Sequence, residues 1–118
     1  MRWLRMRWRR AAEALAMLAL SCGAAAGQDG PPGARQDELL HLLRQDCGSC
    51  HGLTLRGGLG PALTPSMLQP RSDEVLVATI LHGRPGTPMP PWRFAIAPDE
   101  AQWLVMRLRA GDVGHEQQ

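Results

Sequence analysis

The stretch Cys47-Gly48-Ser49-Cys50-His51 decides how this chain of 118 residues is organised. Two cysteines separated by two residues and followed by histidine form a motif at which a haem is covalently attached through thioethers. Cysteines three residues apart lie on one side of a helical turn, within reach of the two vinyl groups of one porphyrin. The adjacent histidine then faces the iron and is an axial ligand. The motif predicts thioethers from Cys47 and Cys50 and a proximal ligand from His51.

Two other readings of the cysteine pair stay open. A C-x-x-C pair also occurs in redox dithiols of the thioredoxin type and as half of a zinc site. A redox motif of that kind accompanies a βαβ pattern, and no such pattern is visible here. A four-ligand zinc site lacks a second cysteine pair, because the only other cysteine is Cys22. Haem attachment is therefore the favoured interpretation.

Residues 1–26 have the pattern of a secretory signal peptide. Five arginines fall within residues 1–10, and a small apolar run follows and ends at Ala24-Ala25-Ala26. A basic start, a short apolar stretch and small residues at its end are typical of such signals, and cleavage after Ala26 predicts a periplasmic protein. The run is short and contains Glu13, so we expect no stable membrane span in the mature form. An uncleaved anchor, or a lipoprotein signal acylated at Cys22, are the alternatives.

Removing the signal peptide changes the charge of the chain. The full sequence has 13 Lys and Arg, all of them arginine, against 11 Asp and Glu, a formal charge of +2. Residues 1–26 hold five of the arginines and one glutamate, so the formal charge of the mature part is −2. A basic surface is the electrostatic feature that nucleic-acid binding requires. We therefore expect no nucleic-acid partner.

The mature sequence reads as one small helical domain. Residues 27–35 are rich in proline and glycine and predict a flexible segment, residues 36–111 form the domain, and residues 112–118 a tail. Leu39, Leu40 and Leu43 predict a helix that begins at Gln36 or Asp37 and runs through the haem motif to Gly52. Thr64-Pro65 predicts a short helical turn through Leu68.

The second half of the domain predicts two more helices around an irregular segment. Ser72 caps a helix that ends at Gly83, while residues 84–92 contain four prolines and exclude regular structure. The last helix runs from Pro98 to Gly111, although Ala97 is a poor residue for its N-terminal cap. No segment alternates with a period of two for long enough to be a strand, so the predicted fold class is all-α.

A six-coordinate haem iron needs a second axial ligand, and methionine is the usual partner of histidine in cytochromes of the c type. Met89 is the favoured candidate because four prolines around it restrain the loop before the metal binds. Met67 and His82 are the alternatives. Met106 lies within the last predicted helix, where filling the core is the expected role.

Three motifs together resemble the class I c-type cytochromes, over residues 36–111. They are Cys47-x-x-Cys50-His51, Gly60-Pro61-x-Leu63 and Gly86-Thr87-Pro88-Met89-Pro90-Pro91-Trp92. The resemblance implies a cytochrome c fold, with about four helices around one covalently attached haem c. It also implies that the carbonyl of Pro61 accepts a hydrogen bond from the proximal imidazole, and that Trp92 packs against the haem. In this family the first and last helices cross.

The resemblance implies a function as well as a fold. With His51 and Met89 filling both axial positions, we expect a monomeric periplasmic carrier of single electrons between redox proteins, and no enzyme. The sequence is similar, more narrowly, to small cytochromes of denitrification encoded beside the haem-d1 nitrite reductase, which makes that reductase a candidate partner. A role in haem d1 biosynthesis or nitrite reductase maturation is the alternative. A third reading is a haem sensor or peroxidase-like site with a labile Met89.

Overall fold

The computed structural model describes residues 30–113, and all regular elements in that range are helices. In chain order they are α2 (Gly33–Leu42), η1 (Leu43–Cys47), α3 (Gly48–His51), α4 (Pro65–Leu68), α5 (Asp73–His82) and α6 (Pro98–Ala110). The first three elements are continuous and together form the first helix, which leaves α4, α5 and α6 as the other three. The prediction of an all-α fold with about four helices is therefore confirmed. The expected signal peptide, residues 1–26, lies outside the described residues. Within residues 30–113 no helix combines the length and apolar character needed to cross a membrane.

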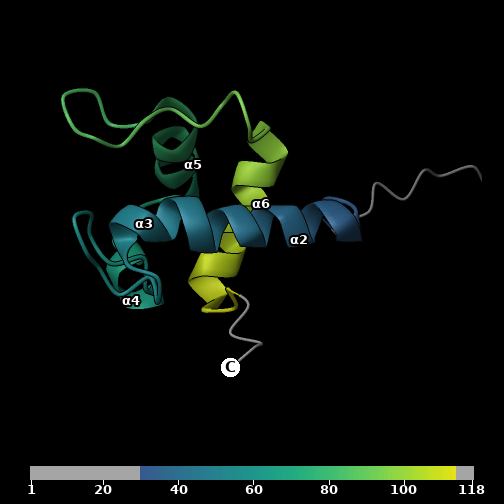
Figure 1. The fold of residues 1–118 in the computed structure, drawn as a ribbon, viewed down its shortest axis with the longest axis horizontal. Coiled ribbons are helices and arrows are strands. Elements are labelled where there is room, and N and C mark those ends of the chain that lie inside the picture. Colours follow the sequence, from purple (N-terminus) through teal and green to yellow (C-terminus); the bar gives the residue numbers. More distant parts are fainter. Residues whose placement is uncertain (1–29, 114–118) are drawn as a thin grey trace, which may run out of the picture.

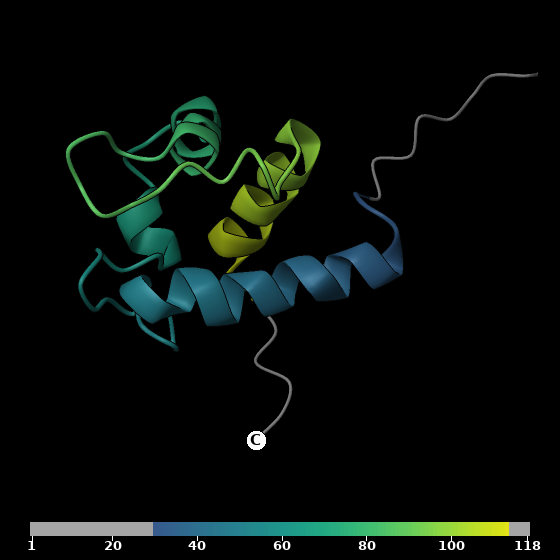
Figure 2. The same cartoon turned by 45° about the horizontal axis from the view of Figure 1, so that its top comes forward.

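The first and last helices cross and share the core of the domain. Figure 1 shows α6 crossing α2, and in both Figure 1 and Figure 2 α4 and α5 lie toward the α3 end of the first helix. Leu39 and Leu43 of the first helix and Trp103 and Leu104 of α6 belong to one buried cluster. Leu39 and Leu104 are almost completely excluded from solvent. Burying such leucines is the main favourable contribution to folding, and here it joins the two ends of the domain.

The first helix begins three residues earlier than predicted. Gly33, Ala34 and Arg35 form the first turn of α2, although they fall in the segment expected to be flexible. Pro32 is the N-terminal cap, where its missing N–H does not matter because the first amides of a helix have no partner within the helix. Pro31 is buried, and its carbonyl accepts a hydrogen bond from the Gln36 side chain at 2.8 Å. The chain before the helix is thus packed against it.

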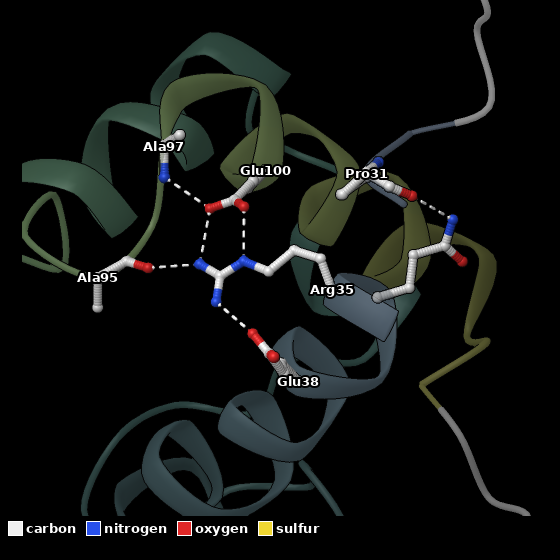
Figure 3. A network of polar contacts seen from close by, with 7 residues as sticks. Pro31, Arg35, Glu38, Ala95, Ala97 and Glu100 are labelled. Atoms are coloured by element: carbon white, nitrogen blue, oxygen red, sulfur yellow. Dashed lines mark hydrogen bonds and ion pairs between the residues drawn. The ribbon is translucent and has the colours of Figure 1, made fainter. Parts of the chain in front are cut away.

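Arg35 ties α2 to the start of α6 (Figure 3). Its Nε and Nη2 donate to the two carboxylate oxygens of Glu100, at 2.7 and 3.0 Å. Nη2 also donates to the carbonyl of Ala95 at 2.7 Å, and Nη1 donates to Glu38 at 2.9 Å. A guanidinium presents several donors in a fixed plane. The Arg35 side chain can therefore hold α2, α6 and the loop before α6 together.

The Glu100 carboxylate also compensates for the poor cap of α6. Ala97 has no side-chain acceptor for the first amides of the helix. The Glu100 side chain reaches back instead and accepts the N–H of Ala97 at 2.9 Å, and Pro98 occupies the first helical position. This is one half of a capping box, and it secures the start of the helix that Ala97 was expected to weaken.

The Arg35–Glu100 pair predicts an acid-dependent loss of stability. Hydrogen bonding to Arg35, and then to the Ala97 amide, lowers the pKa of Glu100 below its ordinary value. A carboxyl with a lowered folded-state pKa contributes stability above its unfolded pKa, about 4.3, and that stability is lost as the pH falls through the folded value. The difference in melting temperature between the wild type and Glu100→Gln is therefore expected to be largest at neutral pH and to shrink below about pH 4.

Thermal unfolding followed by circular dichroism between pH 7 and pH 3 measures this difference. Glu74 is the matched control, because its pKa is also lowered but its partners are its own backbone and Ser72, the N-terminal cap of α5. Glu74→Gln is expected to leave the contribution of Glu100 intact. A pH-independent difference between the wild type and Glu100→Gln would show that the Arg35 pair does not act through the charge of Glu100.

Candidate haem site

His51 ends the first helix with its ring buried, at 8% exposure. Its Nδ1 lies 2.6 Å from the carbonyl oxygen of Pro61. A carbonyl can only accept, so Nδ1 carries the proton and donates it. In the neutral ring the other nitrogen, Nε2, is then the one without a proton and is able to bind a metal, and the hydrogen bond fixes the orientation of the ring. The contact between His51 and Pro61 that the sequence resemblance implied is therefore present.

Gly60 leaves room for the His51 ring. A Cβ at Gly60 would lie 2.9 Å from both Cε1 and Nδ1 of the ring, closer than side-chain atoms pack. The amide of Gly60 donates to the carbonyl of Cys50 at 2.8 Å. The loop that carries Pro61 is thus held against the end of the first helix. The glycine in this loop leaves space for the imidazole of His51.

The pKa of the Cys47 thiol is shifted in the direction opposite to that of a redox dithiol. Burial, and then the negative charge of Asp46, raise the pKa of Cys47 to about 11. Thiols that exchange disulfides or bind zinc act as thiolates and have lowered pKa values. Within residues 30–113 no three side chains of the His, Cys, Asp and Glu types gather as a metal site. The raised pKa of the Cys47 thiol weighs against the dithiol and zinc alternatives.

A cavity of about 820 Å³ lies beside the motif, and two candidates for the second ligand, Met67 and Met89, line it. Cys47, Cys50 and His51 line one side of it, and Met89 and Trp92 line it from the loop before α6. Most of the remaining wall is apolar: Leu43, Leu63, Leu68, Leu76, Ile80, Ile96, Leu104, Val105 and Leu108. The volume lies within the range of cofactor sites, and an apolar wall with a few polar groups suits a flat macrocycle. The residues present therefore fit a haem.

The candidates for the second axial ligand differ in how exposed they are and in whether they line the cavity. Met89 is half-buried and lines the cavity. Met67 lines it as well, from α4, but is 54% exposed. His82, at the end of α5, is exposed and is not among the lining residues. Met106 was expected to fill the core and does not: it is 47% exposed on the outer face of α6.

The aromatic and cationic residues near the cavity are only partly those expected. The ring of Trp92 stacks on Phe94, with centroids 5.9 Å apart, and Trp92 lines the cavity. Among the arginines on the loops, Arg84 lines the cavity, whereas Arg56 and Arg93 do not. Arg71 lines it too and was missed, because it lies between α4 and α5 outside any motif.

The π-helical segment η1, Leu43–Cys47, was also missed. Side chains four residues apart drift by about 40° around an α-helix, because each residue turns about 100°. A π turn contains more residues and reverses that drift, and such turns are frequent at functional sites. Leu39, Leu43, Cys47 and His51 therefore stay on the inner face. The strict four-residue spacing of these side chains was the sequence signal from which the π turn could have been predicted.

Comparisons with known proteins show that this chain is similar to c-type cytochromes. A family model described as cytochrome c oxidase, cbb3-type, subunit III matches residues 34–106. Cytochrome c55X of Pseudomonas aeruginosa is 60% identical over 83 residues, which cover 70% of each chain. A solved c-type cytochrome NirC superposes with a TM-score of 0.69 and 60% identity, over 70% of this chain and 98% of that one. Dihydro-heme d1 dehydrogenase of Pseudomonas aeruginosa is 33% identical over 87 residues, which cover 61% of this chain but only 18% of that protein.

Proposed function

The chain belongs to the c-type cytochromes, in the family that includes cytochrome c55X, and from that premise we propose that it carries single electrons between periplasmic proteins. Its cofactor is a covalently attached haem c. The observation that carries the proposal is one cavity lined by Cys47, Cys50, His51 and Met89. When bound, haem c supplies one-electron exchange between ferric and ferrous iron.

In this proposal the chain's own residues hold the cofactor and close its coordination. Cys47 and Cys50 provide the thioethers, His51 the proximal ligand through Nε2, and Met89 the distal ligand. Pro61 keeps the imidazole oriented through its carbonyl, and Trp92 packs against the macrocycle. If His51 and Met89 both bound the iron, no coordination position would be left for a substrate. The protein is therefore a carrier and not an enzyme, and its potential is high because methionine is a ligand.

The partner in this proposal is a haem-d1 nitrite reductase, and the carrier acts as a monomer in brief encounters. Small, weak interfaces favour rapid electron exchange, because the complex separates quickly after transfer. The signal pattern of residues 1–26 supports a periplasmic location. The narrow similarity to cytochromes of denitrification supports the choice of reductase.

A second candidate is a role in making haem d1 or maturing nitrite reductase. The observation that favours it is the 33% identity to part of a protein named dihydro-heme d1 dehydrogenase. A dehydrogenase releases electrons that some acceptor must take up, and a one-electron cytochrome is suited to that task. The same haem serves either role, so the direction of electron flow with each partner decides between them.

Rapid mixing distinguishes the two roles. The reduced protein is mixed with haem-d1 nitrite reductase, and we expect its haem to be oxidised with a rate constant of about 10⁵–10⁷ M⁻¹ s⁻¹. In the second arm, the oxidised protein is mixed with dihydro-haem d1 dehydrogenase and its substrate. Reduction there, with no oxidation by the reductase beyond that in buffer, would replace the donor role with the maturation role. Inactivity in both arms would refute both.

A further inference from the structure

The loop that carries Met89 is closed by its own backbone hydrogen bonds. Thr87 N–H donates to the carbonyl of Arg84 at 3.0 Å, which makes residues 84–87 a tight turn. Pro85 occupies its second position and Gly86, with φ of +80°, its third, the arrangement of a type II turn. Arg84 N–H donates to the carbonyl of Met89 at 3.2 Å and closes the loop into a ring.

The Thr87 hydroxyl joins the two ends of this ring. Its Oγ1 donates to the carbonyl of Arg84 at 2.7 Å and accepts the N–H of Met89 at 3.3 Å. The Met89 amide is therefore fixed by a side chain two residues before it. Valine has the same shape as threonine but offers neither a donor nor an acceptor. The hydroxyl is thus a direct restraint on the residue that carries the thioether sulfur.

The other side of the loop is anchored separately. Trp92 N–H donates to the carbonyl of Ile80 at 3.0 Å, and Arg93 N–H donates to that of Leu81 at 3.3 Å. The last carbonyls of a helix have no partner within it, so the loop satisfies two at the end of α5. These bonds hold residues 92 and 93 whether or not Thr87 keeps its hydroxyl. Removing the hydroxyl therefore loosens Met89 and leaves the loop attached to the domain.

We propose that Thr87 is a positioning residue for Met89: its hydroxyl sets how firmly the methionine sulfur is presented to the haem iron. This rests on the proposed function, in which Met89 is the distal ligand. A ligand held in its binding geometry loses little conformational entropy when it binds. Without the hydroxyl, Met89 samples more conformations, and an external ligand displaces it more easily.

The test is a titration of the oxidised, haem-loaded protein with imidazole. Thr87→Val is expected to bind imidazole about fivefold more tightly than the wild type, the factor that the loss of one net hydrogen bond produces. Thr87→Ser keeps the hydroxyl and is expected to restore the wild-type affinity. Thr54→Val is the matched control, because Thr54 is exposed, lies outside the methionine loop and does not line the haem cavity.

The spectrum and the melting temperature complete the test. The weak deep-red band of a methionine–ferric haem pair is expected to persist in Thr87→Val without imidazole and to disappear at lower imidazole concentrations. A merely structural role would lower the melting temperature and leave imidazole affinity unchanged, which would overturn the proposal. If Met89 is not the ligand, Met89→Ala retains the band of the wild type, and that outcome refutes the proposed coordination and not only the role of Thr87.

Discussion

Replacing Met89 with alanine is expected to abolish the deep-red absorption band and to lower the reduction potential by on the order of 0.1 V or more. Axial ligands set haem potentials over about 0.8 V, and methionine lies at the high end because its sulfur favours ferrous iron. Alanine leaves one axial position to water or to an external ligand. The reduced Met89→Ala protein is therefore expected to bind carbon monoxide at neutral pH, whereas the wild type is expected not to bind it.

Met67→Ala is the matched control, because Met67 lines the same cavity and the substitution is the same. It is expected to keep the band and the potential of the wild type. Loss of the band in Met67→Ala, with retention in Met89→Ala, would move the ligand to α4. Absence of the band from the wild type would instead favour His82. Carbon monoxide binding by the reduced wild type at neutral pH would favour the sensor or peroxidase-like reading with a labile Met89.

The helices that follow the haem motif were predictable because local chemistry decides their ends. Ser72 accepts the N–H of Val75 at 3.4 Å and starts α5, and Gly83 follows its last residue. Pro98 starts α6, and Gly111 ends it in the left-handed conformation that favours glycine. Such signals act within one turn of the chain. They do not depend on where the rest of the domain lies.

The features that the sequence did not reveal depend on contacts between distant segments. The first turn of α2 contains Arg35, whose partners Ala95 and Glu100 lie 60 and 65 residues away. Composition alone made that turn look flexible. Met106 lies on α6, the helix that contributes most to the core, yet its side chain is on the outer face. Which side chains of α6 face the core depends on how the helix is rotated about its axis. In each case the packing partner, and not the residue type, decided the outcome.

The candidate site likewise has features that the local sequence predicts and features that depend on contacts between distant segments. The haem motif and Met89 could be proposed from residue types and spacing, and the contact of Pro61 with His51 from the resemblance to a known family. That Gly60 lies against the His51 ring, with no room for a Cβ, could not be read from the sequence. Its φ is not positive, so the backbone alone does not require glycine there. The requirement is steric and comes from the imidazole.

Gly60→Ala is therefore expected to lower the free energy of unfolding by about 1–3 kcal/mol, the cost of forcing one extra carbon into a packed site. The added carbon pushes the His51 ring away from Pro61 and weakens the Nδ1 hydrogen bond. That hydrogen bond makes the imidazole a stronger donor to iron, so its weakening is expected to raise the reduction potential. Denaturant unfolding and a redox titration of the haem-loaded protein measure the two effects.

Gly33→Ala is the matched control for this substitution. Gly33 opens α2, and no atom lies within 4 Å of a Cβ built there. Alanine at that position is expected to leave the reduction potential unchanged and to stabilise the protein by no more than about 1 kcal/mol, because alanine favours a helix over glycine. If Gly60→Ala behaves like Gly33→Ala in both measurements, the loop yields without moving the ring. Gly60 would then have no part in holding the proximal histidine.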